Sequence, residues 1–155
     1  LQVYPSMKLS ILGEGTDRKR LESIIEKKQL QNSVSLLGNV SIVEYNRIIS
    51  TCDVVVNSCL KEGAVTVSFD SMRYGKPLIC VDSGGFTRYF SSDYAIVLPR
   101  QTRVELIQSM KKAILNLTDK KLRHSMGELA HKAGQQFVWE VKGTQIKNII
   151  EQNIK

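Results

Sequence analysis

The sequence has no apolar run long enough to cross a bilayer, and no signal-peptide pattern opens it. It also lacks internal repeats and low-complexity tracts. The opening LQVYPSMKLSILG has no initiator Met and leads almost at once into a strand-like stretch, so we expect the sequence to be part of a longer protein. With 155 residues, of which 42% are hydrophobic and 24% charged, it has the size and composition of one globular domain.

Cysteine is scarce, and the three cysteines (Cys52, Cys59 and Cys80) each border an apolar, strand-like run. An odd number without close pairs or partner histidines fits neither a disulfide framework nor a zinc site. We therefore predict buried free thiols in a cytoplasmic protein.

Acidic residues are fewer than basic ones, so the formal net charge is +7. The basic residues concentrate at positions 18–20, 111–112 and 120–123, on segments that read as helices. No aromatic residues interleave them in the manner of a single-strand groove, so no nucleic-acid partner is expected. Solvated helix faces explain these clusters, and a peripheral contact with anionic membrane is the alternative.

Short apolar runs alternate with helical patterns along most of the chain. The predicted strands are 8–12, 34–37, 53–58, 78–81 and 94–98, and the predicted helices are 17–28, 42–50, 64–74, 102–117, 119–135 and 141–155, with a further short helix after the fourth strand. Strands that are apolar on both faces and alternate with helices indicate a parallel sheet covered on both sides. We predict an α/β fold over residues 1–155, a single domain with a Rossmann-like doubly wound parallel sheet followed by C-terminal helices. Ser41 and Glu44 are spaced as a capping box at one helix start.

In such sheets a ligand binds at the carboxyl ends of the strands, so the loops after Leu12, Leu37, Ser58 and Val81 are the candidate walls of a site. The first of these loops, GEGTDR, lacks the third glycine of a dinucleotide fingerprint and the Lys-Ser/Thr pair of a P-loop. A binding turn and a plain tight turn both remain open for it, and the same holds for the paired glycines after Val81.

Histidine is also rare, and no Ser-His-Asp or Cys-His constellation can be assembled from neighbouring loops. His124 and His131 lie in the C-terminal helices, away from the predicted site. We predict that both are surface residues without a catalytic role.

The stretch KEGAVTVSFDSMRYGKP, from Lys61 to Pro77, is the most informative in the chain. It places Glu62 at a strand-to-helix turn and Asp70 eight residues later, on the same helix face. Between them, the amides of residues 63–65 would be unpaired donors at a helix N-terminus, suited to a phosphate. A sugar at Glu62, a diphosphate at the amides and a ribose at Asp70 describe a nucleotide-sugar. The alternative is a charge that balances the helix dipole and an ordinary polar residue on the helix face.

Three runs, ILGEGTDRKRLE, VSLLGNVSIVEYNRIISTCDVVVNS and KEGAVTVSFDSMRYGKPLICVDSGG, together resemble the C-terminal, donor-binding domain of group 1 (family 4) retaining glycosyltransferases of GT-B fold. The diagnostic element is a glutamate, seven residues, a second glutamate and then Gly-Lys-Pro; the late FVWE also matches. The resemblance implies that the first strand and helix of the domain and the whole N-terminal acceptor domain precede this sequence.

The resemblance assigns roles to individual residues. Glu62 would approach the transferred sugar as the catalytic residue, and Asp70 would hold the ribose hydroxyls. The other residues that it implies at the donor are Gly13, Gly15, Gly38, Gly63, Ala64, Val65, Gly84, Gly85 and Arg88. Gly63 and the next amides would face the diphosphate, and Gly38 would lie near the base.

Three positions depart from the family pattern. Asp70 replaces the usual glutamate, which shortens the side chain by one C–C bond. Val65 replaces a frequent glycine, and Arg88 replaces a glutamate and could meet phosphate instead. These departures bear on the strength of nucleotide binding and leave the fold unaffected.

The activity that the resemblance implies is transfer of a hexosyl group, with retention, from a UDP- or GDP-sugar to a growing glycan of a capsule, exopolysaccharide or lipopolysaccharide. No cofactor or metal is expected, because no Asp-x-Asp motif occurs and a helix N-terminus with basic residues would carry the leaving-group charge. The glycan or lipid-linked acceptor would bind the missing domain, so this chain alone is not expected to catalyse transfer.

The expected location is the cytoplasm, at the inner face of the plasma membrane. The alternatives are a degenerate GT-B domain that acts as a binding or scaffold module, and a related nucleotide-sugar epimerase.

Overall fold

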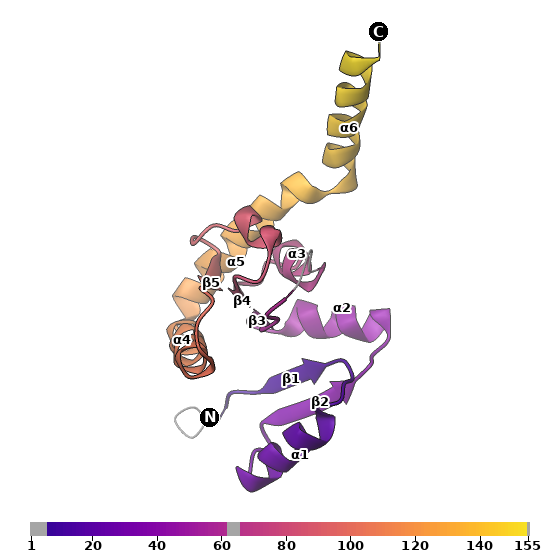
Figure 1. Cartoon of the computed structure of the whole chain (residues 1–155). Coiled ribbons are helices and arrows are strands. Elements are labelled where there is room, and N and C mark those ends of the chain that lie inside the picture. The colour runs from indigo at the N-terminus through magenta and orange to yellow at the C-terminus, as the bar shows by residue number, and fades with distance from the viewer. Residues whose placement is uncertain (1–5, 62–65, 155) are drawn as a thin grey trace. The chain divides into compact units, whose positions relative to one another are not determined.

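A computed structural model describes residues 6–61 and 66–154, and they divide into two compact units, Leu1–Ile48 and Ile49–Lys155 (Figure 1). In chain order the helices and strands are β1 (Leu9–Leu12), α1 (Arg18–Lys27), β2 (Val34–Gly38), α2 (Ile42–Thr51), β3 (Val55–Asn57), α3 (Thr66–Arg73), β4 (Leu78–Val81), the 3-10 helix η1 (Gly85–Tyr89), β5 (Ala95–Leu98), α4 (Arg103–Asn116), α5 (Lys120–Gly134), the 3-10 helix η2 (Gln135–Phe137) and α6 (Trp139–Asn153).

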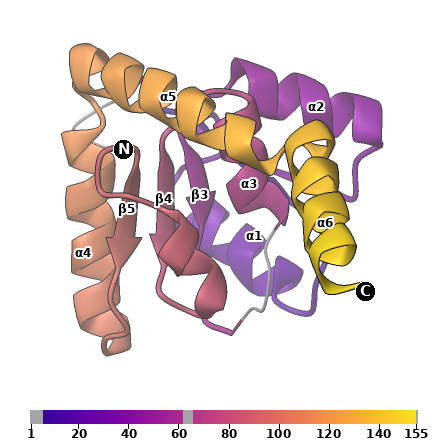
Figure 2. The ribbon, with the colours of Figure 1, turned by 90° about the horizontal axis from the view of Figure 1, so that it is seen from above.

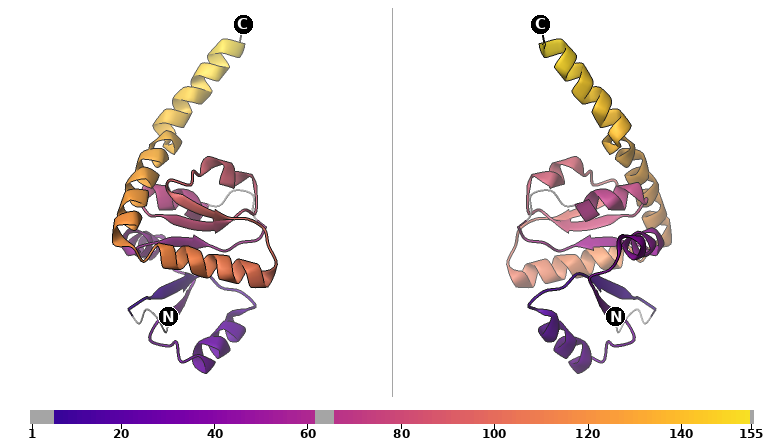
Figure 3. Two further views of the ribbon diagram at one scale, coloured as in Figure 1. Left: turned by 90° about the vertical axis from the view of Figure 1, so that its left-hand side faces the viewer. Right: turned by 90° about the vertical axis from the view of Figure 1, so that its right-hand side faces the viewer.

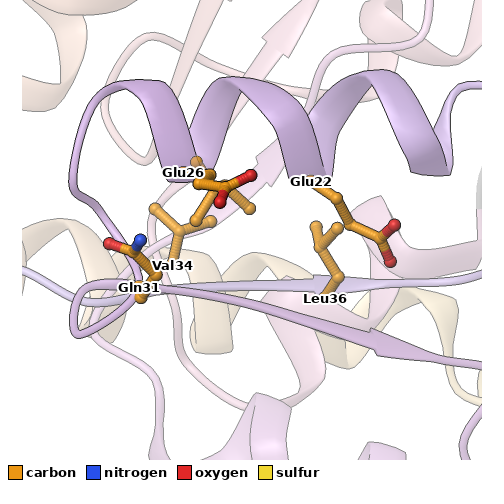
Figure 4. Close-up of a pocket in the computed structure, with 6 residues that line it drawn as sticks. Glu22, Glu26, Gln31, Val34 and Leu36 are labelled. Carbon is orange, nitrogen blue, oxygen red and sulfur yellow. The ribbon is translucent and has the colours of Figure 1, made fainter.

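The first unit is a β-α-β arrangement in which β1 and β2 run parallel and α1 connects them. Parallel neighbours need such a crossover because the chain must return to the same end of the sheet. Ile25 of α1 lies opposite Val34 and Leu36 of β2, and these side chains line an open groove of about 410 Å³. Figure 4 shows Glu22 and Glu26 extending from α1 beside this groove.

Helix α2 begins after Ser41, whose hydroxyl accepts a hydrogen bond of 3.2 Å from the Glu44 amide. The predicted N-cap is therefore confirmed. The Glu44 carboxylate binds Arg47 through two hydrogen bonds of 2.6 and 2.8 Å, and these hold the pKa of Glu44 below its usual value.

The second unit contains a three-stranded parallel sheet in the order β3-β4-β5, with Leu78 of β4 beside both Val55 and Ala95 (Figure 2). All four residues of β4 are buried, as expected for a central strand covered on both faces. Every strand thus runs parallel to its neighbour, and the predicted α/β class with C-terminal helices is confirmed. The described strands form two sheets, one in each unit, and the single domain expected for residues 1–155 stays a prediction.

The core of the second unit lies between this sheet and the helices that follow it. Its buried members lie on β4, β5, α4 and α5 and at the residue after α4, and they are Ile79, Leu98, Ala113, Leu117 and Met126. Half-buried apolar side chains of β5, α4 and the residue before β3 pack around them, namely Val54, Ile96, Leu106, Met110 and Ile114. Helix α4 begins with a complete capping box between Thr102 and Glu105. These elements make the carboxyl edge of β4 and β5 a firm support for the loops beyond it.

Helices α3 and α5 approach one another closely through small residues. Helix α3 is followed by Gly75, whose positive φ of 61° favours glycine, and the Lys76 amide bonds the Ser71 carbonyl across this turn. A Cβ on Gly127 of α5 would collide with the Gly75 carbonyl oxygen, and one on Gly134 would crowd the backbone of Met72. Glycine at both positions therefore permits the two helices to touch.

The last helix begins at Trp139 and not at 141 as the sequence pattern predicted, because η2 and the extended Val138 separate it from α5. In Figure 3, α6 continues past the end of α5, away from strands β3 to β5. Its apolar residues Trp139, Ile146 and Ile149 are all more than half exposed. Within residues 6–61 and 66–154, no helix is both long and apolar enough to cross a membrane.

The basic cluster at 120–123 is not wholly solvated. Arg123 is half-buried, and one of its terminal nitrogens donates to the carbonyls of Leu117 and Thr118 at 2.8 and 2.9 Å. These carbonyls lie at the C-terminal end of α4, where a cation is favourable. Lys120 and Lys121, by contrast, are exposed, as predicted.

The three cysteines are free thiols, but their burial differs. Cys80 is inaccessible and Cys52 is half-buried, whereas Cys59 is exposed, so the prediction of buried thiols is wrong for Cys59. It lies beyond β3, in the loop at the carboxyl edge of the sheet, where the apolar run has already ended.

We expect iodoacetamide to label Cys59 rapidly and Cys80 hardly at all in the folded protein at pH 8. Burial, with the Asp82 carboxylate nearby, raises the pKa of the Cys80 thiol to about 11, so little of the reactive thiolate forms. Peptide mass spectrometry after a short labelling time measures both rates. Labelling of both residues in urea is the control, and equal rates without urea would contradict the buried position of Cys80.

Candidate functional site

In the first unit, two of the predicted glycines meet at the ends of the paired strands. The Gly13 amide donates a 2.8 Å hydrogen bond to the Gly38 carbonyl, in an isolated antiparallel bridge just beyond β1 and at the last residue of β2. Both residues have positive φ angles, 106° for Gly13 and 66° for Gly38, which side chains other than glycine rarely adopt. The backbone geometry therefore accounts for glycine at both positions.

Beside this bridge lies an ion pair that sequence reasoning missed. Arg18 binds Glu14 at 2.9 Å and Glu22 at 3.0 Å, and it also donates to the Leu36 carbonyl at 3.3 Å. A Cβ on Gly38 would collide with the Glu14 carboxylate. Gly15 is exposed, and no atom lies within 4 Å of where its Cβ would be. The positive φ angles therefore favour glycine at 13 and 38, whereas the Cβ positions of both Gly13 and Gly15 lie in open space.

Four of the predicted site residues lie outside the described residues: Glu62, Gly63, Ala64 and Val65. The roles that the sequence assigns to them stay predictions. The remaining ones in the second unit, namely Asp70, Gly84, Gly85 and Arg88, can be located on α3, on η1 and on the loop between β4 and η1.

Asp70 lies in the second half of α3 and is half-buried. Two residues before it, Ser68 is fully buried and accepts a 3.2 Å hydrogen bond from the side-chain amide of Asn57, the last residue of β3. The side-chain oxygen of Asn57, Oδ1, in turn accepts a hydrogen bond from the Cys59 amide at 3.1 Å. This buried polar contact joins the end of the strand to the helix that carries Asp70, and the sequence offered only one hint of it, a polar residue at the end of the apolar run DVVVN.

The loop after β4 carries Gly84 and Gly85 and is closed by Thr87. The Thr87 hydroxyl donates to the Asp82 carboxylate at 2.7 Å and lies 3.0 Å from the Gly84 carbonyl, which also accepts from the Thr87 amide at 3.3 Å. Ser83 is buried, and among the described residues its hydroxyl has no hydrogen-bond partner. Gly84 is fully extended, and Gly85 is exposed at the first position of η1.

Arg88 is exposed and bound to its neighbour. Its guanidinium donates to the Tyr89 hydroxyl at 2.9 Å and lies over the Tyr89 ring, 4.9 Å from the centroid. The Tyr89 ring packs against Phe69 of α3, with 5.9 Å between centroids, and against Phe137 of η2, with 5.7 Å. Phe69 therefore joins the helix that carries Asp70 to the turn that carries Arg88.

The two histidines are exposed, as predicted. His124 lies 3.4 Å from Glu128, and His131 lies 3.2 Å from the carbonyl of Arg73. In the part of the chain that the structure describes, no group of three or more His, Cys, Asp or Glu side chains could hold a metal ion.

Parallel sheets whose strands are followed by loops that contain glycine occur in a known class of fold. The chain matches the solved GtfA/B complex with a TM-score of 0.83 and 17% identity, over 97% of this chain and 31% of that one. It matches the pneumococcal O-GlcNAc transferase GtfA, solved with UDP and GlcNAc, with a TM-score of 0.81 and 20% identity, over 97% of this chain and 30% of that one. The fold is that of GT-B glycosyltransferases.

The chain belongs to the group 1 glycosyl transferases, whose family model matches residues 1–151. A curated relative, a phosphatidylinositol N-acetylglucosaminyltransferase subunit of Arabidopsis thaliana, is 26% identical over 113 residues, which are 73% of this chain and 25% of that protein. This chain therefore spans less than a third of the length of these relatives. The family expected from the three sequence runs is confirmed.

Proposed function

We propose that this chain binds the nucleotide-sugar donor in a retaining glycosyltransferase that moves a hexosyl group from a nucleoside diphosphate to a growing glycan. The observation that carries the proposal is the family match over residues 1–151, which includes the stretch from Lys61 to Pro77 with its two carboxylates. A solved relative of the same fold holds UDP and GlcNAc, which supports a UDP-sugar as the donor.

The described contacts support a firm setting for the second carboxylate. Asp70 lies on a helix held at Ser68 by Asn57 and at Phe69 by the aromatic rings of η1 and of the residue after it. A half-buried carboxylate held in this way can accept hydrogen bonds from two vicinal ribose hydroxyls, provided that the donor approaches within the shorter reach of aspartate. Glu62 would orient the sugar, and the amides of residues 63–65 would face the diphosphate.

In the mechanism that we propose, the acceptor hydroxyl attacks the anomeric carbon from the face that the diphosphate leaves. The glycosidic bond forms as the bond to the diphosphate breaks, the hydroxyl proton passes to the departing diphosphate, and the anomeric configuration is retained. The amide donors at the start of α3 and basic side chains would stabilise the departing diphosphate without a metal ion. The acceptor, a glycan or a lipid-linked glycan, would bind a domain outside this chain. The name of the Arabidopsis relative specifies phosphatidylinositol, which supports a lipid-linked acceptor.

Replacing Asp70 with glutamate should tighten the binding of UDP. The longer side chain restores about 1.3 Å of reach, and a charge-assisted hydrogen bond contributes ~1.5–3 kcal/mol, so a gain of about tenfold in affinity is expected. Isothermal titration with UDP, GDP and ADP measures the affinity and identifies the preferred base. Asp53→Glu is the matched control, because Asp53 precedes β3 at the opposite end of the strand.

Two results would contradict the proposal. Weaker UDP binding by the Asp70→Glu variant would overturn the ribose assignment. If none of the three nucleotides or a UDP-sugar bound at millimolar concentration, the donor-binding role would fail and a scaffold module without transfer activity would be favoured. The engagement of Arg88 by Tyr89 is the structural observation that favours this second function, because it occupies a side chain otherwise expected at the donor.

A further inference from the structure

Arg100 ties the loop after β5 to the loop after β4. It lies two residues beyond Leu98, the last residue of β5, and its Nε atom donates to the Asp82 carbonyl at 2.9 Å. One of its terminal nitrogens donates to the Ser83 carbonyl, also at 2.9 Å. Two successive backbone carbonyls are thus held by one guanidinium.

These carbonyls lie just past the point where the sheet ends. The last backbone hydrogen bond between the two chain segments runs from the Asp82 amide to the Leu98 carbonyl at 2.8 Å. Ser83 is only 4% exposed, so its backbone needs partners within the protein, whereas Asp82 is exposed. The planar guanidinium presents several donors in a fixed geometry, which a lysine ammonium does not.

The other end of the same loop is held by Thr87, through its contacts with Asp82 and Gly84. Thr87 holds the Gly84 carbonyl and Gly85 begins η1, so the part of the loop that depends on Arg100 is the backbone of Asp82 and Ser83, which leads into the glycine pair. Without Arg100 this backbone would sample more conformations, and a ligand would have to select one of them at a cost in affinity.

We propose that Arg100 is a positioning residue for donor binding: it holds the backbone of residues 82–85 in the conformation that meets the nucleotide-sugar. The proposal rests on the proposed function, because it assigns the loop to that donor site. Arg100 itself need not touch the ligand. Its effect passes through the two carbonyls, which lie 17 and 18 residues earlier in the sequence.

The test compares Arg100→Ala, Arg100→Lys and Arg103→Ala in two measurements, UDP affinity by calorimetry and amide hydrogen exchange of residues 82–89 without ligand. Arg103 is an exposed arginine on the first turn of α4, so its replacement by alanine removes the same charge as a matched control. We expect Arg100→Ala to weaken UDP binding about tenfold, equivalent to ~1.4 kcal/mol, and to speed exchange in the loop. Arg100→Lys should rescue neither property fully, and Arg103→Ala should change neither.

The two measurements separate the possible failures. Unchanged exchange in Arg100→Ala would overturn the attachment of the loop. Faster exchange with unchanged UDP affinity would overturn the positioning role. Absence of UDP binding in the unmodified chain would overturn the proposed function and with it the role in donor binding, while the exchange data would still decide whether Arg100 holds the loop.

Discussion

Replacing Gly127 with alanine should lower the free energy of unfolding of the second unit by ~2 kcal/mol. The added methyl group would collide with the carbonyl oxygen of Gly75, where α5 passes the end of α3. Overpacking of this kind costs ~1–3 kcal/mol and occasionally more. We expect the cost of the collision alone to lie at the upper end of that range. A backbone carbonyl cannot rotate away as a flexible side chain can, and Gly75 already has a positive φ.

Helix propensity acts in the opposite direction at this position. Alanine is favoured over glycine inside a helix by ~1 kcal/mol. The collision costs more than the propensity gains, so the net change is a loss of ~2 kcal/mol and, for a unit of about 100 residues, a fall of ~8–16 °C in the melting temperature. Helix propensity alone would predict that Gly127→Ala is stabilising, whereas the collision with Gly75 makes it destabilising.

Replacing two other glycines with alanine should have smaller or opposite effects on the free energy of unfolding. A Cβ on Gly134 would lie 3.0 Å from the Met72 Cβ, so Gly134→Ala should be mildly destabilising. No atom lies within 4 Å of the corresponding position on Gly143 in α6, so Gly143→Ala should raise helix stability by up to ~1 kcal/mol. Urea unfolding followed by circular dichroism gives all three values. A stable Gly127→Ala variant would mean that α3 and α5 do not pack as described.

Replacing Asn57 with alanine should destabilise the second unit by ~3 kcal/mol. Asn57 is 5% exposed, and its amide group bonds the Ser68 hydroxyl and the Cys59 amide. Cys59 is an exposed residue, so its half-buried amide can turn to water, but Ser68 has no exposed surface. A buried polar group left without its partner costs ~1–3 kcal/mol, and the space left by the missing amide adds to that cost.

A double-mutant cycle isolates the hydrogen bond from the cavity. Asn57→Ala, Ser68→Ala and the double variant should show a coupling energy of ~1 kcal/mol, because once one partner is gone, removing the other costs less. Asn116→Ala, at the exposed end of α4, is the matched control and should be close to neutral. Strictly additive losses would show that Asn57 and Ser68 do not share a hydrogen bond in solution.

The predicted strands and helices agree closely with the structure where the apolar pattern is strong. Residues 78–81 were expected as a strand, and β4 has these bounds with all four residues buried. The start of α6 was placed two residues late, because the short turn of η2 produces no periodic pattern. Cys59 was expected to be buried because it follows an apolar run, although burial depends on where the strand ends and the loop begins.

The candidate site was predictable only in part. Gly13 and Gly38 were assigned to the donor site through the resemblance to the family, and this role stays a prediction; their positive φ angles account for glycine at both positions. Arg100 and Asn57 gave no comparable signal. Their partners lie 17, 18 and 11 residues away, and the hydrogen bonds form only when separate strands and helices come together.

The sequence alone determined the α/β class and the glycosyltransferase family, because apolar periodicity and motif spacing are local properties of the chain. The stretch from Lys61 to Pro77 is recognisable for the same reason, because its motif depends only on spacing along the chain. Only the tertiary structure decided which glycines lie at a helix contact, which arginine holds the loop after β4, and how Arg88 is engaged by Tyr89. These outcomes depend on close approach between side chains and backbone in the folded chain, and no spacing along the sequence encodes such distances.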